Sequence, residues 1–122
     1  MEPNQIRGKR ILVVDDDAGT RESVRLLLQI DRHTVFEASN GTEALETLAR
    51  ENLDLVILDF FMPGMPGNEL ALKIKAVAPS LPMLMISAYL EKLGERETPV
   101  DVVLGKPFGL EDLRRALARL LG

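Results

Sequence analysis

The sequence predicts a single α/β domain built around a doubly wound, five-stranded parallel sheet. Apolar runs that do not alternate with polar residues are typical of strands covered on both faces. Four such runs are present, at Ile11–Val14, Leu55–Leu58, Met83–Ile86 and Val102–Leu104. Amphipathic helical patterns lie between them, and β-α alternation of this kind implies right-handed crossovers. The length of 122 residues fits one domain with one buried core.

The remaining elements follow from local patterns along the chain. A weaker run at Thr34–Ala38 mixes polar and apolar residues, as an edge strand does. Asn40 followed by Glu43 resembles a capping box and predicts a helix that continues to Arg50. Three more helices are indicated by apolar residues that share one helical face, namely Val24, Leu27 and Leu28; Leu70, Ile74 and Val77; and Leu110, Leu113, Leu117 and Leu120.

Two segments depart from this regular pattern. The connection before the last strand contains Gly94 and Pro99, which leave room for about two helical turns at most. We therefore expect a shortened fourth helix. Residues 1–9 are polar and are expected to form a loose N-terminal tail, so that residues 10–122 make up the folded domain.

Composition excludes several classes of function. The chain contains no cysteine, which excludes disulfides, thiolate metal sites and a cysteine nucleophile. The formal net charge of −4 disfavours nucleic-acid binding by this domain. Residues 1–10 lack the apolar region of a signal peptide, and the longest apolar stretch, Leu81–Leu90, is too short to span a membrane. We expect a cytoplasmic protein that does not bind membranes.

Polar side chains follow four of the predicted strands, at the point where each strand ends. Asp15–Asp17 follow the first strand, Asp59 the third, Ser87 the fourth and Lys106 the fifth. The carboxyl ends of parallel strands meet at one edge of the sheet, which is where ligands bind in open α/β folds. If the strand order is 2-1-3-4-5, the carboxylates of Asp15, Asp16 and Asp59 converge there.

The residue types at this edge suit phosphoryl transfer. Carboxylates held close together repel one another, and a hard cation such as Mg²⁺ removes that cost through oxygen ligands. A carboxylate such as Asp59 can also attack phosphorus as a nucleophile. Lys106 can contribute positive charge, and Ser87 a hydroxyl donor, to the phosphoryl oxygens.

Each of these residues also has an ordinary structural interpretation. Asp15–Asp17 could form a solvated turn that ends in a helix N-cap. Asp59 could simply open a turn, and Lys106 could be a solvated surface lysine. Their joint position at one sheet edge favours a shared site. His33, the single histidine, lies in a polar connection and is expected to be an exposed turn residue, not a ligand.

Five short motifs, taken together and in order, resemble the receiver domain of two-component response regulators. They are Ile-Leu-Val-Val-Asp-Asp at 11–16, Leu-Val-Ile-Leu-Asp at 55–59, Met-Pro-Gly-Met-Pro-Gly at 62–67, Ile-Ser-Ala at 86–88 and Lys-Pro-Phe at 106–108. The resemblance extends from Arg10 to Leu121. It implies a flavodoxin-like fold with strand order 2-1-3-4-5.

The resemblance also implies a role for each site residue. Asp59 would be the phosphoacceptor, and Lys106 and Ser87 would contact the phosphoryl group. Asp15, Asp16 and Asp59, with the backbone carbonyl of Phe61, would bind Mg²⁺, for which Mn²⁺ can substitute. The implied site therefore consists of Asp15, Asp16, Asp59, Phe61, Ser87 and Lys106.

The implied activity is that of a phosphorylation-activated switch in a phosphorelay. The phosphodonor would be a phosphohistidine of a sensor histidine kinase or of a histidine phosphotransfer protein. The domain would catalyse only its own phosphorylation and slow dephosphorylation, so it is not an enzyme in the usual sense. A covalently linked effector or kinase domain is a further expected partner. Phe61 and Tyr89 would flank the path of the water that hydrolyses the aspartyl phosphate.

Some residues differ from the family pattern. Val103 occupies a position that often holds an aromatic switch residue, Pro66 replaces a common Asp, and Gly109 replaces a frequent helix cap.

Two other functions compete with that of a receiver domain. A phosphatase of the haloacid dehalogenase type is weakly suggested by the Asp-Asp-Asp-Ala-Gly-Thr segment at 15–20, in which Gly-Thr is displaced by one residue. A phosphorylation-independent interaction module is disfavoured by the complete acidic set with Lys106.

Overall fold

A computed structural model describes residues 6–88 and 100–122. Five parallel strands form one sheet in the order β2-β1-β3-β4-β5, which confirms the predicted topology. The strands are β1 (Arg10–Val14), β2 (Thr34–Ala38), β3 (Leu55–Asp59), β4 (Met83–Ser87) and β5 (Val102–Gly105). Each of the four apolar runs in the sequence lies in one of these strands, and the mixed run forms the edge strand β2.

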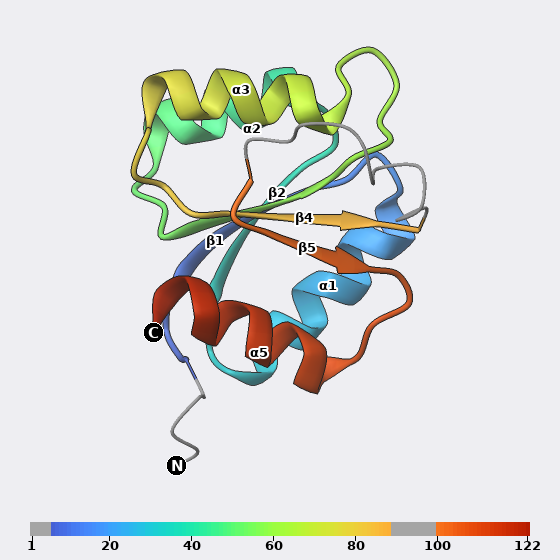
Figure 1. Cartoon of the computed structure of the whole chain (residues 1–122), viewed down its shortest axis with the longest axis vertical. Coiled ribbons are helices and arrows are strands. Elements are labelled where there is room, and N and C mark those ends of the chain that lie inside the picture. Colours follow the sequence, from blue (N-terminus) through green and yellow to red (C-terminus); the bar gives the residue numbers. More distant parts are fainter. Residues whose placement is uncertain (1–5, 89–99) are drawn as a thin grey trace.

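Helices cover both faces of the sheet (Figure 1). One face is covered by α1 (Ala18–Ile30) and α5 (Leu110–Leu121), and the other by α2 (Gly41–Arg50) and α3 (Gly67–Val77). The domain is therefore doubly wound, as predicted. No helix among the described residues is both long and apolar enough to cross a membrane.

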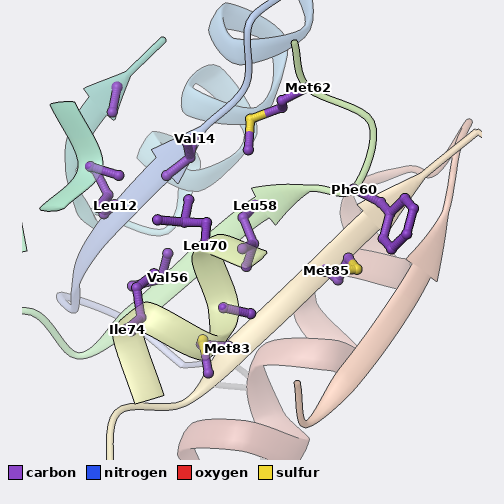
Figure 2. Close-up of a cluster of buried hydrophobic side chains, with 13 residues drawn as sticks. Leu12, Val14, Val56, Leu58, Phe60, Met62, Leu70, Ile74, Met83 and Met85 are labelled. Atoms are coloured by element: carbon purple, nitrogen blue, oxygen red, sulfur yellow. The ribbon is translucent and has the colours of Figure 1, made fainter. Parts of the chain in front are cut away.

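The core has two parts, one on each face of the sheet. Leu12 and Val14 of β1 pack on the α2 and α3 side, whereas Ile11 and Val13 pack on the α1 and α5 side. Figure 2 shows the first of these clusters, in which side chains from β1, β3 and β4 meet Leu70 and Ile74 of α3. Because alternate residues of each strand enter different clusters, the strands read as continuous apolar runs.

Side-chain caps begin two of the helices as local sequence rules require. The Asp17 carboxylate accepts a hydrogen bond from Thr20 N at 3.0 Å at the start of α1. The Asn40 side chain accepts from Glu43 N at 2.9 Å, and the Glu43 carboxylate accepts from Ser39 N at 2.7 Å. The Asn40 cap is the first half of the capping box that the sequence indicated, whereas Glu43 bonds the backbone N of Ser39, one residue before the N-cap, and not that of Asn40.

His33 was predicted to be an exposed turn residue, and this prediction is wrong. Its side chain is buried, with the residue only 5% exposed. Lys9 N donates to His33 Nδ1 at 3.0 Å, and Gly8 N donates to the carbonyl of Asp31 at 3.3 Å. The chain before β1 thus runs along the turn after α1 and covers the imidazole, a long-range contact that a polar local sequence does not reveal.

Some predictions lie outside the described residues. The shortened fourth helix and Tyr89 both fall within residues 89–99, and much of the predicted tail falls within residues 1–5. The domain boundary at residue 10 stays a prediction.

Candidate functional site

The candidate site lies at the carboxyl edge of the sheet. Asp15 follows β1, Asp59 is the last residue of β3, Ser87 is the last residue of β4, and Lys106 follows β5. The strand register aligns Ser87 with Gly105, the residue before Lys106, and Lys106 N donates to the carbonyl of Ser87 at 2.8 Å. Four segments distant in sequence are therefore brought together because their strands end at the same level.

Three carboxylates and one ammonium group form the centre of this site. One oxygen from each of Asp15, Asp16 and Asp59 can be chosen so that all lie within 4.8 Å of one another. Lys106 Nζ lies 3.3 Å from Asp15 Oδ2 and 3.4 Å from Asp59 Oδ1. Asp15 and Asp59 are buried, whereas Asp16 is exposed, so the cluster opens to solvent on one side.

Asp15 is held by hydrogen bonds at several of its polar atoms. Its backbone N donates to the carbonyl of Ala38 on β2 at 3.1 Å, and its carbonyl accepts from Arg21 Nη1 at 2.7 Å. Its Oδ1 accepts from Asp17 N at 2.9 Å. With the residue only 1% exposed, these partners fix the direction in which the carboxylate points.

Burial raises the pKa of Asp59 to about 6 from an ordinary value of 3.8. The nearby Lys106 ammonium opposes this shift, while the negative charges of Asp15 and Asp16 add to it. Asp17 differs from Asp59, because its hydrogen bonds from the Thr20 hydroxyl and backbone lower its pKa. Asp17 thus acts as the helix cap, and the ordinary interpretation holds for this residue.

The loop between β3 and α3 lies beside the cluster. The Phe60 ring is buried and the Phe61 ring is 38% exposed, with the two rings edge to face at a centroid distance of 4.6 Å. Figure 2 shows Phe60 at the edge of the apolar cluster, to which it belongs. A hollow of about 410 Å³ next to the site is lined by Asp16, Phe60, Phe61, Met62, Pro63 and Pro66.

Two positions that shape the site were missed by the sequence analysis. Gly67 N donates to the carbonyl of Phe60 at 2.7 Å, and a Cβ on Gly67 would lie 2.3 Å from the carbonyl oxygen of Asp59. The Met-Pro-Gly-Met-Pro-Gly motif includes this glycine, but only the fold shows the close approach. Arg21 gave no signal in the sequence, because its contact with Asp15 depends on how α1 follows β1.

Comparison with known proteins identifies the class to which this fold and site belong. The family model described as the response regulator receiver domain matches residues 11–118. The chain therefore belongs to the response regulator receiver family, whose members are phosphorylation-activated switches of two-component signalling systems.

Individual relatives agree with this assignment. The response regulator MprA of Mycobacterium ulcerans is 38% identical over 115 residues, which cover 92% of this chain and 50% of the relative. The chain thus spans about half the length of the curated relatives it matches.

Two solved structures resemble this domain closely. The response regulator TrrA of Thermotoga maritima, solved in complex with Mg²⁺ and BeF, is 35% identical, with a TM-score of 0.87 and coverage of 93% of this chain and 99% of that chain. The receiver domain of a sensor histidine kinase from Pseudomonas aeruginosa, with a magnesium ion in its active-site cleft, is 25% identical. Its TM-score is 0.83, with coverage of 93% of this chain and 97% of that chain.

Proposed function

We propose that this domain accepts a phosphoryl group on Asp59, with a divalent cation bound by the surrounding carboxylates. The observation that carries the proposal is the position of Asp59. Its carboxylate is largely buried, lies within 4.8 Å of two other carboxylates, and is contacted by Lys106 at 3.4 Å. A buried acidic group with a strongly perturbed pKa and a fixed cation beside it is typical of a reactive site.

The donor set fits a magnesium ion. Mg²⁺ prefers oxygen ligands at 2.0–2.1 Å in an octahedron, so its ligand oxygens lie about 3 to 4 Å apart. The oxygens of Asp15, Asp16 and Asp59, all within 4.8 Å of one another, are close to this spacing. The carbonyl of Phe61, two residues after Asp59, is proposed as a backbone ligand. When bound, Mg²⁺ supplies positive charge that offsets the repulsion among these carboxylates and the incoming phosphoryl oxygens.

Three side chains of this chain have proposed roles in the phosphoryl transfer itself. The ionised Asp59 carboxylate attacks phosphorus, so that an oxygen–phosphorus bond forms while the bond from phosphorus to the donor's leaving group breaks. Lys106 is placed to neutralise charge on the transferred group, and Ser87 to donate a hydrogen bond to it. Phosphoryl transfer depends mainly on such positioning and charge compensation.

The family supports a proposal for the phosphodonor and for the output. We propose that a phosphohistidine on a sensor histidine kinase or a histidine phosphotransfer protein supplies the phosphoryl group. Since the matched relatives are about twice as long as this chain, an effector or kinase domain linked to the receiver is the proposed recipient of the signal.

Slow dephosphorylation is proposed to follow from the side chain at position 61. Hydrolysis needs a water in line with the bond that breaks, and the exposed Phe61 ring offers no group that could orient this water. Its edge-to-face contact with the buried Phe60 ring favours a fixed position beside the site. The phosphorylated domain is therefore expected to persist longer than a Phe61→Asn variant.

The nucleophile can be tested by intact-mass spectrometry after incubation with Mg²⁺ and acetyl phosphate. We expect one added phosphoryl group on the parent and none on Asp59→Asn, because an amide is a far poorer nucleophile. Asp54→Asn is the matched control, since Asp54 is an exposed carboxylate before the same strand, and it should be labelled like the parent. Full labelling of Asp59→Asn, or steady turnover of external phosphoesters without a stable adduct, would contradict the proposal.

A further inference from the structure

Arg21 connects the acidic cluster to the neighbouring strand β2. It belongs to α1, and its guanidinium reaches back over the loop that leads out of β1. Its Nη1 donates to the carbonyl of Asp15 at 2.7 Å, while its Nε lies 3.2 Å from Glu37 Oε1. The Arg21 side chain is only 18% exposed, so its position is restricted by the protein around it.

Glu37 fixes the orientation of this guanidinium from the other side. Its carboxylate lies between two arginines of α1, with Oε1 facing Arg21 and Oε2 lying 3.3 Å from Arg25 Nε. Arg25 pairs with Glu37 and, at 3.5 Å, with Glu22 on its own helix. The two arginines therefore share one carboxylate, but Arg21 is the one that extends to the proposed metal site.

We infer that Arg21 is a positioning residue for cation binding, which acts through the backbone of Asp15. This inference rests on the function proposed above. The Asp15 carbonyl belongs to a residue that is 1% exposed, so loss of its donor would leave a poorly solvated acceptor and favour a shift of the loop. Because the same short loop carries the Asp15 and Asp16 carboxylates, such a shift moves two proposed ligands together.

The charge of Arg21 and its proposed positioning role predict opposite changes in Mg²⁺ affinity when Arg21 is replaced. Arg21 is a positive charge close to a site that binds a positive ion, so its removal should strengthen Mg²⁺ binding through Coulomb repulsion alone. Its removal should weaken binding if Arg21 holds the ligands in place. Groups that orient the ligands of a metal typically contribute about tenfold or more to affinity.

The experiment is a Mg²⁺ titration of the full chain, followed through amide chemical shifts of the loops around Asp15 and Asp59. We expect about tenfold weaker binding for Arg21→Met. Arg25→Met removes the same charge from the same helix without touching Asp15, and should bind Mg²⁺ as well as the parent or slightly better. Arg21→Lys keeps the charge but lacks the planar guanidinium that bonds the Asp15 carbonyl and Glu37 together, so we expect binding weaker than that of the parent and stronger than that of Arg21→Met.

Each outcome bears on the inference. Unchanged or tighter binding by Arg21→Met and Arg21→Lys would overturn it, and so would equal weakening by Arg25→Met, which would point to the ion-pair network as a whole. If Arg21→Met fails to fold, Arg21→Lys carries the test at constant charge. Absence of Mg²⁺ binding by the parent would refute the proposed function and the inference together, whereas normal parental binding with unaffected Arg21 variants would refute the inference alone.

Discussion

Replacement of Asp59 by Asn should stabilise the metal-free domain while it abolishes phosphorylation. The Asp59 pKa of about 6, against an ordinary 3.8, means that the folded protein holds a proton on this group more readily than the unfolded chain does. The ionised carboxylate therefore destabilises the folded state above pH 6. This penalty declines as the pH falls through about 6 toward 3.8, and it vanishes below both values.

The size of the effect follows from the difference in pKa. One pKa unit corresponds to about 1.4 kcal/mol, so the difference between 3.8 and about 6 gives about 3 kcal/mol at pH 7.5. The pKa of about 6 already includes the opposing effect of Lys106, which lies 3.4 Å from Asp59 Oδ1, and solvent on the open side of the cluster reduces the penalty further. We therefore expect Asp59→Asn to gain about 1 to 2 kcal/mol in free energy of unfolding.

Urea denaturation followed by circular dichroism, in the presence of a chelator, measures this gain. At pH 4.5 the gain should shrink to about one third of its value at pH 7.5. Saturating Mg²⁺ at pH 7.5 should stabilise the parent more than the variant and narrow the difference. Asp54→Asn is expected to show no comparable gain, because Asp54 is exposed. The proposed destabilisation by ionised Asp59 would be refuted if Asp59→Asn were no more stable than the parent at pH 7.5. It would also be refuted if the gain in free energy of unfolding were the same at both pH values.

Three further predictions concern metal, pH and packing. At a hundredfold excess over Kd, Mg²⁺ should stabilise the parent by about 2.7 kcal/mol in thermal melts, and Asp16→Ala should lose most of this effect. Burial lowers the pKa of His33 below 6.5, so its contribution to stability is present above pH 6.5 and lost as the pH falls below it; urea titrations of His33→Asn should lack this loss. Gly67→Ala should lose about 1 to 3 kcal/mol in the same assay, because its Cβ would meet the Asp59 carbonyl, whereas Gly19→Ala, with no contact nearer than 3.8 Å, should lose nothing.

The topology was predictable because it depends on local patterns. The four continuous apolar runs indicate strands that are buried on both faces of a sheet. The β-α alternation then leaves few possible topologies. The helix that begins at Asn40 followed from a capping pattern only four residues long. The convergence of Asp15, Asp59 and Lys106 was predictable for the same reason, since each ends a strand of one parallel sheet.

Contacts that depend on how elements pack were not predictable in this way. His33 was assigned to the surface because its neighbours in sequence are polar, yet residues 6–9 cover it. The turn that it occupies is tied to α5 by Arg114, whose Nε and Nη2 each lie 2.8 Å from a carboxylate oxygen of Asp31. Arg21 likewise acquires its contact with Asp15 only when α1 is placed beside β1 and β2. His33 meets Lys9, which is 24 residues away, whereas Arg21 and Asp15 are six residues apart, and in both cases the contact forms only after separate elements pack.

The geometry that supports Asp59 as the proposed phosphoacceptor also destabilises the folded state. Asp59 ends a strand whose residues are all buried, with Ile57 and Leu58 in the two opposite core clusters. A carboxylate at this point cannot move into solvent without pulling β3 out of register with β4, where it pairs with Ile86. Its ionised form must therefore be compensated in place, by Lys106 and, in the proposed function, by a bound cation. The crowding of carboxylates both destabilises the fold and creates the proposed site for metal and phosphoryl groups. Substitutions that remove this destabilisation are therefore expected to weaken the binding of metal and phosphoryl groups.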